Sequence, residues 1–415
     1  MAAFNSSSAL FFFFIFFFFL VHRYLVSAAT AAKYDVVALG AVPGGKAGIS
    51  EALLRAWESA CGSPGPSTIY VPSGRFLVEK PVEFAGPCQG GPIGIRIDGS
   101  LVAPSNYTAI GSSYSWLSFQ RVSGVSISGG ILDGQGSGLW KCKNSSAATN
   151  CPSGAMSLLF SNSKNIIISR LTSLNSQMFH IVMDGCQDVR VHGVKVFADG
   201  MSPNTDGIHV QDSTGVTITS SRVATGDDCV SITQGSSDVW VEDVMCGPGH
   251  GISIGSLGKR LEEEGVENVT VTSVTLTETT NGVRIKAWGR PSSGFARNIR
   301  FQNVVMNNVE NPIIIDQNYC PDNINCPGQV CIPQLYWRHN RATTFSVQLK
   351  STPNLFSVAQ ITPQSFTGFW SEDQQRNLSK HPRDISHPGW DEVRLQHHES
   401  MHRNTARERG AHVQG

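Results

Sequence analysis

Acidic and imidazole side chains recur at a fixed spacing near the middle of the 415-residue chain. They are Asp206 in "SPNTDGIHV", Asp227 and Asp228 in "TGDDCVSI", and His250 in "GPGHGISIG". Asp228 follows Asp206 by 22 residues, and His250 follows Asp228 by the same 22 residues. Carboxylates held close together raise one another's pKa, so that one acid stays protonated beside others that stay ionised. Hydrolysis of a glycosidic bond needs this combination of a proton donor and an ionised carboxylate.

Two cations follow these motifs in "GVRIKAW", where Arg284 and Lys286 stand two residues apart. At that spacing both side chains project from the same side of a β-strand. Arginine and lysine beside a group of acids indicate a substrate that itself carries carboxylates. For any one of these residues alone, the alternative is a solvated turn or a polar ladder on the surface. The common register of the whole set favours a functional site.

A short phrase, in which a turn residue precedes alternating aliphatic residues, recurs from about residue 120 onward. Its copies are "SGVSISGG" (123–130), "KNIIISRL" (164–171), "QDVRVHGV" (187–194), "TGVTITSS" (214–221), "SDVWVEDV" (237–244), "ENVTVTSV" (267–274) and "RNIRFQNV" (297–304). The anchors of the later copies are Ile166, Val189, Val216, Val239, Val269 and Ile299, at steps of 23, 27, 23, 30 and 30 residues. Alternation with period two predicts β-strands, and recurrence at such steps predicts a solenoid. We expect an all-β, single-domain parallel β-helix over residues 30–331; a β-sandwich is the alternative, but it would need hairpin turns.

Stacked coils turn the sequence spacing of the acids into spatial adjacency. A step of 22 residues is close to one coil, so Asp206, Asp228 and His250 should stand one above another, roughly 5 Å apart per coil. Similar alternating residues follow each of them, which fixes the register. The 30-residue step brings Arg284 and Lys286 to the next level of the same wall.

An amphipathic helix is predicted to cover the N-terminal end of the solenoid. "ISEALLRAWESAC" (49–61) places Leu53, Leu54, Trp57 and Ala60 on one side, at helical spacing. Ser50 is the predicted N-cap. The helix lies between the candidate strands 33–41 and 67–74. Because a solenoid needs its ends covered, we interpret this helix as the N-terminal cap.

The charge and the N-terminus limit the partners and the compartment. The chain has 32 basic and 32 acidic residues, so no global charge favours nucleic acid or a membrane surface. The apolar run "ALFFFFIFFFFLV" (9–21) is too short for a typical transmembrane helix, and small residues follow it. We interpret residues 1–29 as a secretory signal peptide, with an uncleaved anchor as the alternative. The mature chain is expected to be a secreted, extracellular or cell-wall monomer without membrane contact.

Ten cysteines fit an oxidising compartment. Local pairing would join Cys61 to Cys88, Cys142 to Cys151, Cys229 to Cys246 and Cys320 to Cys326, leaving Cys186 and Cys331. The alternative for each is a free buried thiol, because connectivity is not readable from one sequence. Sequons at Asn106, Asn144, Asn268 and Asn377 are available for glycosylation of a secreted chain.

The motifs "NTDGIHV", "GDDCVSI", "GHGISIGSLG" and "RIKAW", in this order and at these separations, resemble those of the plant polygalacturonases, which are pectin-cleaving glycoside hydrolases. The resemblance covers about residues 33–331. It implies a right-handed parallel β-helix, a metal-free mechanism without cofactors, and hydrolysis of α-1,4-galacturonan with inversion of configuration. The implied partner is an anionic polysaccharide, polygalacturonate or pectin.

The resemblance also implies catalytic roles. Asp227 would be the general acid that protonates the glycosidic oxygen, and Asp206 with Asp228 would hold and activate the attacking water. An inverting geometry needs a gap of roughly 6.5–9.5 Å between acid and base. His250 would support the acid.

Five positions, His250 among them, match residues that shape the cleft or contact substrate in that family. Asn204 and His250 would shape the cleft, and Arg284 with Lys286 would bind a galacturonate carboxylate. Tyr319 in "DQNYC" matches a substrate contact, although a packed aromatic at the edge of a coil is the alternative. A disulfide between Cys229 and Cys246 is implied as well.

The chain departs from the family after "CPGQV" (326–330), where further coils would be expected. Residues 376–415 hold 6 of the 12 histidines and cannot bury a β face, which predicts disorder. We hypothesise that the divergent tail, residues 332–415, comes from a shifted reading frame or an unspliced intron; genuine divergence is the alternative. An uncovered end would expose unpaired strand edges and apolar core, so that the chain would fold poorly.

Two other functions remain as alternatives. A β-helix pectate lyase, which uses calcium and a basic residue for elimination, would also present an acidic face, but the quoted motifs do not fit it. A catalytically impaired, pectin-binding homologue is made plausible by the abnormal tail.

Overall fold

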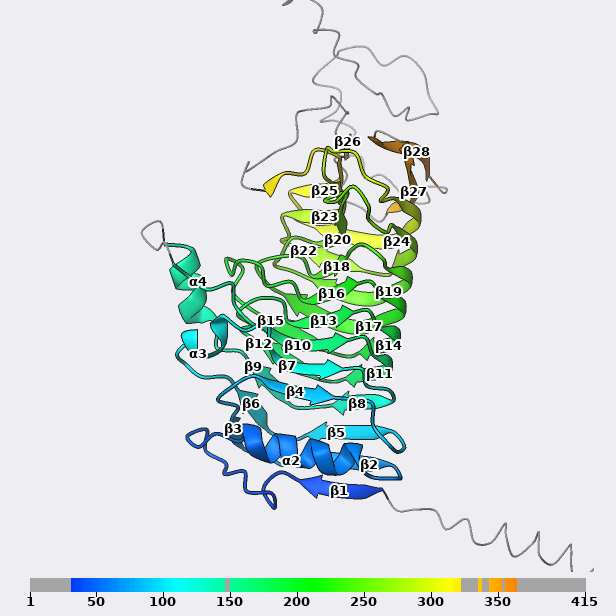
Figure 1. Cartoon of the computed structure of the whole chain (residues 1–415). Coiled ribbons are helices and arrows are strands. Elements are labelled where there is room, and N and C mark those ends of the chain that lie inside the picture. Colours follow the sequence, from blue (N-terminus) through cyan, green and yellow to red (C-terminus); the bar gives the residue numbers. More distant parts are fainter. Residues whose placement is uncertain (1–30, 146–149, 322–334, 338–342, 353–354, 364–415) are drawn as a thin grey trace, which may run out of the picture.

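The computed structural model describes residues 31–145, 150–321, 335–337, 343–352 and 355–363. Its strands stack into a parallel β-helix, whose coils follow one another from the N-terminal to the C-terminal end in Figure 1. One wall is a ten-stranded sheet. Its strands are β4 (Val82–Ala85), β7 (Ser115–Gln120), β10 (Met156–Ser161), β13 (Ile181–Asp184), β16 (Ile208–Gln211), β18 (Val230–Ile232), β20 (Ile252–Leu257), β23 (Asn281–Ala287), β25 (Asn311–Asp316) and β26 (Leu335–Trp337).

An eighteen-stranded sheet forms the other walls as two ladders. The first ladder holds β1 (Ala32–Asp35), β2 (Ser67–Val71), β5 (Ile93–Ile97), β8 (Val125–Ser128), β11 (Lys164–Ser169), β14 (Gln187–His192), β17 (Thr214–Ala224), β19 (Ser237–Cys246), β21 (Val266–Thr272), β24 (Ala296–Asn307), β27 (Thr343–Thr352) and β28 (Leu355–Pro363). The second holds β3 (Arg75–Leu77), β6 (Ser100–Val102), β9 (Ile131–Asp133), β12 (Thr172–Leu174), β15 (Lys195–Phe197) and β22 (Thr275–Thr277). The long strands β17, β19 and β24 belong to both ladders.

The predicted anchors form one continuous column in the first ladder. Ile166 pairs with Val189, Val189 with Val216, Val216 with Val239, Val239 with Val269, and Val269 with Ile299. Every anchor is 0% or 1% exposed and belongs to one hydrophobic core that runs through the stack. The repeat phrase therefore predicted both the fold and its register, because each coil buries its aliphatic residues against the next.

A left-handed residue makes the bend between the two ladders in successive coils. The bend residues are Arg170, Gly193, Ser220, Asp243, Ser273 and Asn303, with φ between 49° and 63°. Each lies four residues after an anchor, so the bend keeps the same place in every coil. A single residue in this conformation turns the chain sharply without breaking the parallel pairing on either side.

Helix α2 (Ser50–Cys61) covers the N-terminal end of the β-helix, as predicted (Figure 1). Leu53, Ala56 and Trp57 are buried against the first strands. The predicted N-cap at Ser50 is wrong, because the helix already includes Ser50 and its cap position is Ile49, which has no capping side chain. Glu79 takes that role from a distant loop: its Oε2 accepts hydrogen bonds from the backbone N–H of Ser50 at 3.2 Å and from Ser50 Oγ at 2.8 Å.

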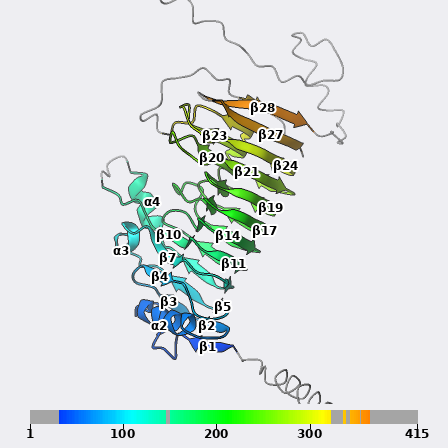
Figure 2. The ribbon, with the colours of Figure 1, turned by 45° about the vertical axis from the view of Figure 1, so that its right-hand side comes forward.

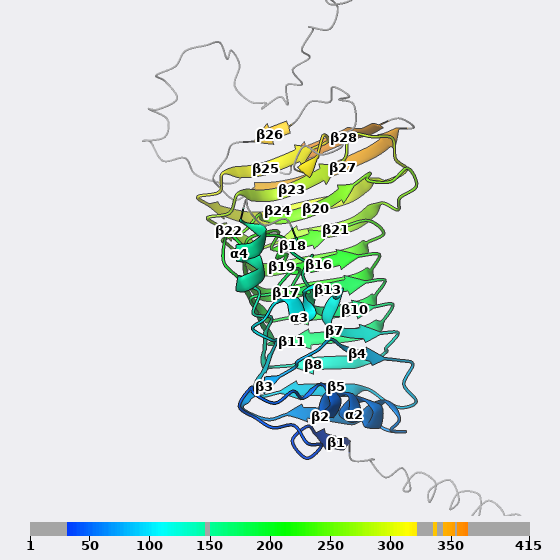
Figure 3. The ribbon, with the colours of Figure 1, turned by 60° about the vertical axis from the view of Figure 1, so that its left-hand side comes forward.

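Two short helices, α3 (Thr108–Gly111) and α4 (Ser137–Lys143), lie on one side of the stack (Figure 3). The Cys142–Cys151 disulfide closes the loop that begins with α4. Among the residues that the structure describes, no helix is long and apolar enough to cross a membrane. The predicted signal peptide, residues 1–29, lies outside the described residues.

The C-terminal end of the stack differs from the expected uncovered edge. Strand β26 pairs antiparallel with β25. Strand β27 pairs antiparallel with β24 and with β28, and these three strands lie side by side in Figure 2. The last parallel strands therefore have paired edges, and part of the divergent tail supplies them. The sequence concealed this because an antiparallel closure has no need of the repeat phrase. Residues 364–415 lie outside the described part of the chain.

Three of the predicted disulfides are present: Cys61–Cys88, Cys142–Cys151 and Cys229–Cys246. Cys320 is also disulfide-bonded. Its predicted partner Cys326, and Cys331, which the prediction left over, lie outside the described residues. Cys186 is a free thiol inside the core, where burial raises its pKa to about 11. This matches the expectation that it has no local partner.

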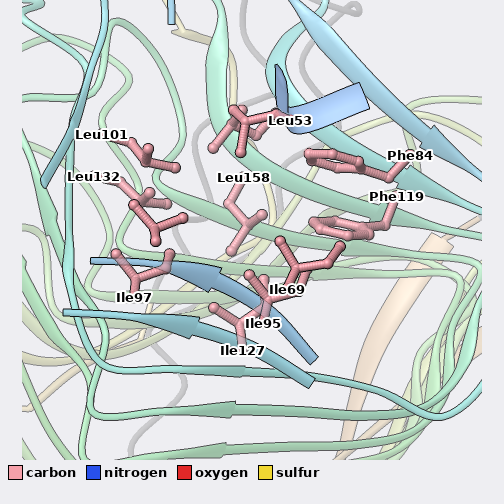
Figure 4. Close-up of a pocket in the computed structure, with 12 residues that line it drawn as sticks. Leu53, Ile69, Phe84, Ile95, Ile97, Leu101, Phe119, Ile127, Leu132 and Leu158 are labelled. Carbon is pink, nitrogen blue, oxygen red and sulfur yellow. The ribbon is translucent and has the colours of Figure 1, made fainter. Parts of the chain in front are cut away.

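A small cavity lies inside the N-terminal coils, below Leu53 of α2 (Figure 4). Its lining is entirely apolar: Leu53, Ile69, Val71, Phe84, Ile95, Ile97, Leu101, Leu117, Phe119, Ile127, Leu132 and Leu158. Without a polar or titratable side chain, this cavity offers no chemistry for a hydrolytic site. The candidate site lies elsewhere, on the outer face of the ten-stranded sheet.

Candidate active site

The predicted stacking of the acids is confirmed by the register of the ten-stranded sheet. Ile208 pairs with Val230, and Val230 pairs with Ile252. These residues lie two positions after Asp206, Asp228 and His250, so the three residues precede neighbouring strands at the same level of the register. The strands are β16, β18 and β20, which Figure 3 shows one above another. Arg284 and Lys286 follow on the adjacent strand β23.

Asp228 is fixed by two cations. Its Oδ1 lies 2.8 Å from Arg284 Nη2, and its Oδ2 lies 2.8 Å from Lys286 Nζ. Ser253 Oγ donates a third hydrogen bond to Oδ1 at 2.8 Å. The Asp228 side chain is only 1% exposed. Burial alone would raise the pKa of Asp228, but Lys286 and Arg284 hold it below its usual value, so this carboxylate stays ionised.

Asp227 is paired with His250 instead. His250 Nδ1 lies 3.1 Å from Asp227 Oδ1, and the backbone N–H of Asp228 donates to the same oxygen at 2.8 Å. The hydrogen bond to Asp227 raises the pKa of His250, against the effect of burial. The Asp227 side chain is 19% exposed and that of His250 is 38% exposed, so both reach the surface.

Asp206 is buried, and its neighbours are a serine and a histidine. Ser231 Oγ donates a hydrogen bond to Asp206 Oδ2 at 2.6 Å, and His209 Nδ1 lies 3.7 Å from the same oxygen. Burial raises the pKa of Asp206 and the neighbouring Asp227 raises it further, while His209 opposes both effects. The raised pKa of Asp206 contrasts with the lowered pKa of Asp228.

The remaining predicted residues also lie beside this cluster. The Lys286 Nζ atom is 5.3 Å from the ring centroid of Tyr319, whose ring meets Trp288 edge to face. Asn204 is exposed, with φ of 56°, on the turn that leads into Asp206. The structure therefore joins Tyr319 to the cluster through Lys286, whereas Asn204 is placed only by its position two residues before Asp206.

His209 and Ser231 belong to the site but were missing from the predicted set. Both are buried at the surface of the ten-stranded sheet, at 8% and 1% exposure. A signal for them existed in the sequence: His209, Ser231 and Ser253 each stand three positions after Asp206, Asp228 and His250. A polar residue that recurs three positions after these residues in successive coils predicts a second column of polar side chains beside the acids.

The turn that carries the two adjacent acids is held by threonine hydrogen bonds and by a disulfide. Thr225 Oγ1 is 2.7 Å from Thr205 Oγ1 and also bonds to the Thr205 carbonyl oxygen. The Cys229–Cys246 disulfide holds the residue directly after Asp228. Such support on rigid elements gives the acids a defined separation.

Gly226→Ala is expected to displace this turn. A Cβ at Gly226 would lie 2.2 Å from the Ser202 carbonyl oxygen, so the backbone would have to move. We expect a loss of about 1–3 kcal/mol of stability and at least a tenfold fall in turnover, measured by urea unfolding and by product release. Gly94→Ala is the matched control, because its Cβ would meet nothing closer than 3.7 Å. Equal behaviour of the two variants would show that the turn tolerates movement.

A divalent cation does not fit the cluster. Among the described residues, Asp227, Asp228 and His250 offer ligand atoms within 4.8 Å of one another. Both oxygens of Asp228 already accept hydrogen bonds from fixed cations, Arg284 and Lys286. A metal ion would have to approach two positive side chains and would find few of the oxygen ligands that calcium needs.

Residues 61–332 match the family described as Glycosyl hydrolases family 28. The chain is 58% identical over 313 residues to a polygalacturonase from Prunus persica, covering 75% of this chain and 79% of the relative. It is 48% identical to an exopolygalacturonase from Platanus acerifolia, covering 67% of this chain and 73% of the relative. Among solved structures, it superimposes on an endo-xylogalacturonan hydrolase from Aspergillus tubingensis with a TM-score of 0.63 and 25% identity, covering 71% and 79% of the two chains.

Proposed function

Because the chain belongs to glycosyl hydrolases family 28, we propose that it is a polygalacturonase that hydrolyses α-1,4-galacturonosyl linkages of pectin with inversion of configuration. One observation carries the proposal. A partly exposed acid, Asp227, adjoins a fully buried carboxylate, Asp228, that two cations keep ionised. Glycoside hydrolysis requires this division between a proton donor and an ionised partner.

Asp227 is the proposed general acid. Its side chain reaches the surface and so can meet the glycosidic oxygen, whereas Asp206 and Asp228 are buried behind it. The neighbouring Asp227 raises the pKa of Asp206, so Asp206 is proposed to hold the proton that passes to Asp227. His250, bonded to Asp227, orients this carboxyl group toward the leaving oxygen.

Asp206 and Asp228 are proposed to hold and activate the attacking water. Asp228 stays ionised and orients the water from a fixed position. Once the proton of Asp206 has moved to Asp227 and from there to the leaving oxygen, the ionised Asp206 accepts the proton that the attacking water loses. Water then attacks the anomeric carbon on the face opposite the leaving group, which inverts the configuration.

Arg284 and Lys286 are proposed to bind a galacturonate carboxylate. Both cations already pair with Asp228, yet together they carry one more positive charge than that carboxylate neutralises. An anionic sugar restores the balance, which favours polygalacturonate over a neutral glycan. Tyr319 lies beside Lys286, where its ring can contact the sugar, and the exposed Asn204 faces solvent near Asp206.

Secretion into the cell wall as a monomer is part of the proposal. The apolar run 9–21 and the oxidised cysteines support a secreted chain. Strand β24 pairs with β27 and β25 pairs with β26, so the last coil has covered edges. This supports a folded, active enzyme over a catalytically impaired, pectin-binding homologue. The relatives include an exopolygalacturonase and an endo-acting hydrolase, so sizing the products on polygalacturonate distinguishes terminal from internal cleavage: monomer alone identifies exo cleavage and a ladder identifies endo cleavage.

Incubation of the purified chain with polygalacturonate tests the reaction class. We expect new reducing ends, no ultraviolet-absorbing unsaturated products, and no loss of rate with a chelator. Proton NMR at early times should show the β-anomer first, since the substrate linkage is α. Unsaturated products whose formation stops with chelator would instead identify a lyase. Binding of polygalacturonate without any reducing ends would identify an impaired homologue.

A further inference from the structure

Four outward-facing side chains form one register column across the site. His209 on β16 pairs with Ser231 on β18, Ser231 with Ser253 on β20, and Ser253 with Arg284 on β23. In the first three strands, the column residue stands three positions after a residue of the acid column, which is Asp206, Asp228 or His250. It begins with an imidazole and ends with a guanidinium, and the two residues between them are serines.

At the Arg284 end, the column holds Asp228 through a serine. Arg284 Nε donates to Ser253 Oγ at 3.0 Å, and Ser253 Oγ donates to Asp228 Oδ1 at 2.8 Å. Arginine has no acceptor atom, so the direction of this chain of hydrogen bonds is fixed from cation to carboxylate. The serine hydroxyl is polarised by the cation and points at the carboxylate.

The same arrangement recurs one coil earlier around Asp206. Ser231 Oγ donates to Asp206 Oδ2 at 2.6 Å, and His209 Nδ1 lies 2.7 Å from Ser231 Oγ. A serine hydroxyl carries one hydrogen, and here the carboxylate receives it. The His209 Nδ1 atom must therefore carry the hydrogen of the second bond, which assigns the tautomer from the network.

We propose that His209 is a positioning residue that acts on Asp206 through Ser231, in the place that Arg284 has for Asp228. The proposal rests on the proposed function of the site. Its consequence is a difference between the two carboxylates that hold water. Asp228 is held through Ser253 by a guanidinium, whereas Asp206 is held through Ser231 by a single imidazole N–H.

The surroundings keep the His209 ring in the required orientation. Phe179 stacks on it, with ring centroids 4.5 Å apart and an interplanar angle of 20°. The charged groups near the ring are Asp206 on its own coil and Asp184 on β13, while Asp227 and Asp228 on the next coil act on Asp206. The His209 side chain is only 11% exposed, so solvent screens these groups weakly.

Two substitutions separate hydrogen bonding from packing. His209→Phe keeps a ring against Phe179 but removes the donor to Ser231, and His209→Asn restores an N–H near the same position. We expect His209→Phe to lower kcat about 10- to 100-fold with KM within about twofold of wild type. The acidic limb of its kcat/KM profile should move to higher pH, because ionised Asp206 loses a donor chain. His209→Asn should recover most of kcat and the position of that limb.

Ser231→Ala should reproduce the His209→Phe profile, because both break the same chain. The matched control is His192→Phe: His192 Nδ1 lies 2.9 Å from Thr219 Oγ1 on the next coil, but on the eighteen-stranded sheet, away from the acids. This variant should leave kcat and the pH profile unchanged. Thermal unfolding of each variant, followed by circular dichroism, checks that it is folded.

The proposal is overturned if His209→Asn is as impaired as His209→Phe, or if neither variant moves the acidic limb. It is equally overturned if Ser231→Ala behaves as wild type. These outcomes are separate from failure of the proposed function, in which the wild-type chain itself releases no reducing ends. If the wild-type chain is active but the acidic limb does not move in the His209 variants, only the proposed role of His209 is refuted.

Discussion

Asp227→Asn is expected to reduce kcat on polygalacturonate by about 10²- to 10⁴-fold, with little change in KM. The amide cannot donate a proton to the glycosidic oxygen at neutral pH. It can still accept the hydrogen bonds from His250 Nδ1 and from the backbone N–H of Asp228, which hold the side chain in place. The fold and the cationic pair on Asp228 should therefore be retained, so that the loss reports on proton transfer.

Kinetics on two substrates make this test specific. Reducing-end assays on polygalacturonate give kcat and KM, and an aryl galacturonide with a good leaving group gives the rate of a reaction that needs little acid assistance. The loss in Asp227→Asn should be much smaller on the aryl substrate. Asp238→Asn is the matched control, because Asp238 is an exposed ladder residue whose Oδ1 accepts a bond from Asn268 at 3.0 Å. An equal loss on both substrates would contradict the role of Asp227 as the acid.

The repeat phrase predicted the fold because register in a β-helix is set by burial. Each coil must place its aliphatic residues above those of the coil before it, so Val216 and Val239 could be aligned from their spacing alone. The stacking of Asp206 and Asp228 followed from the same register. What the spacing could not predict is which partner each acid selects, since Asp227 and Asp228 are neighbours in sequence but bond to different groups.

Contacts between distant segments account for the features that the sequence concealed. Ser50 has the sequence signature of an N-cap, yet Glu79 reaches the helix from 29 residues away. Strand β27 closes the stack by antiparallel pairing, which leaves no trace in the period of the repeat. His209 was overlooked because a histidine in an alternating strand is most often a surface residue, and only the recurring phase of Ser231 and Ser253 marks it.

Asp228→Asn and Asp206→Asn are expected to change stability in opposite directions. Asparagine at position 228 leaves Arg284 and Lys286 buried without a counter-charge, at 14% and 9% side-chain exposure. Removing one partner of such a group costs about 3–5 kcal/mol. Asparagine at position 206 still accepts the bond from Ser231, and it removes a carboxylate that burial makes costly to ionise. Both variants should lose activity.

The pH dependence fixes the sign of each effect. The pKa of Asp228 is lowered in the folded protein, so its contribution to stability is present above the unfolded pKa of about 3.9 and is lost as pH falls through the folded value. The pKa of Asp206 is raised, so its contribution is present below the unfolded pKa and is lost as pH rises through the folded value. The gain in Asp206→Asn should therefore grow from pH 4 to pH 7.

Urea unfolding of both variants at pH 4, 5 and 7, followed by tryptophan fluorescence, checks these signs. Destabilisation of Asp206→Asn at pH 7 by as much as Asp228→Asn would contradict the inferred ionisation of the site. The expected result would show that the chain keeps one carboxylate that favours folding and another that opposes it. The second is retained because its tendency to hold a proton serves the reaction at the expense of stability.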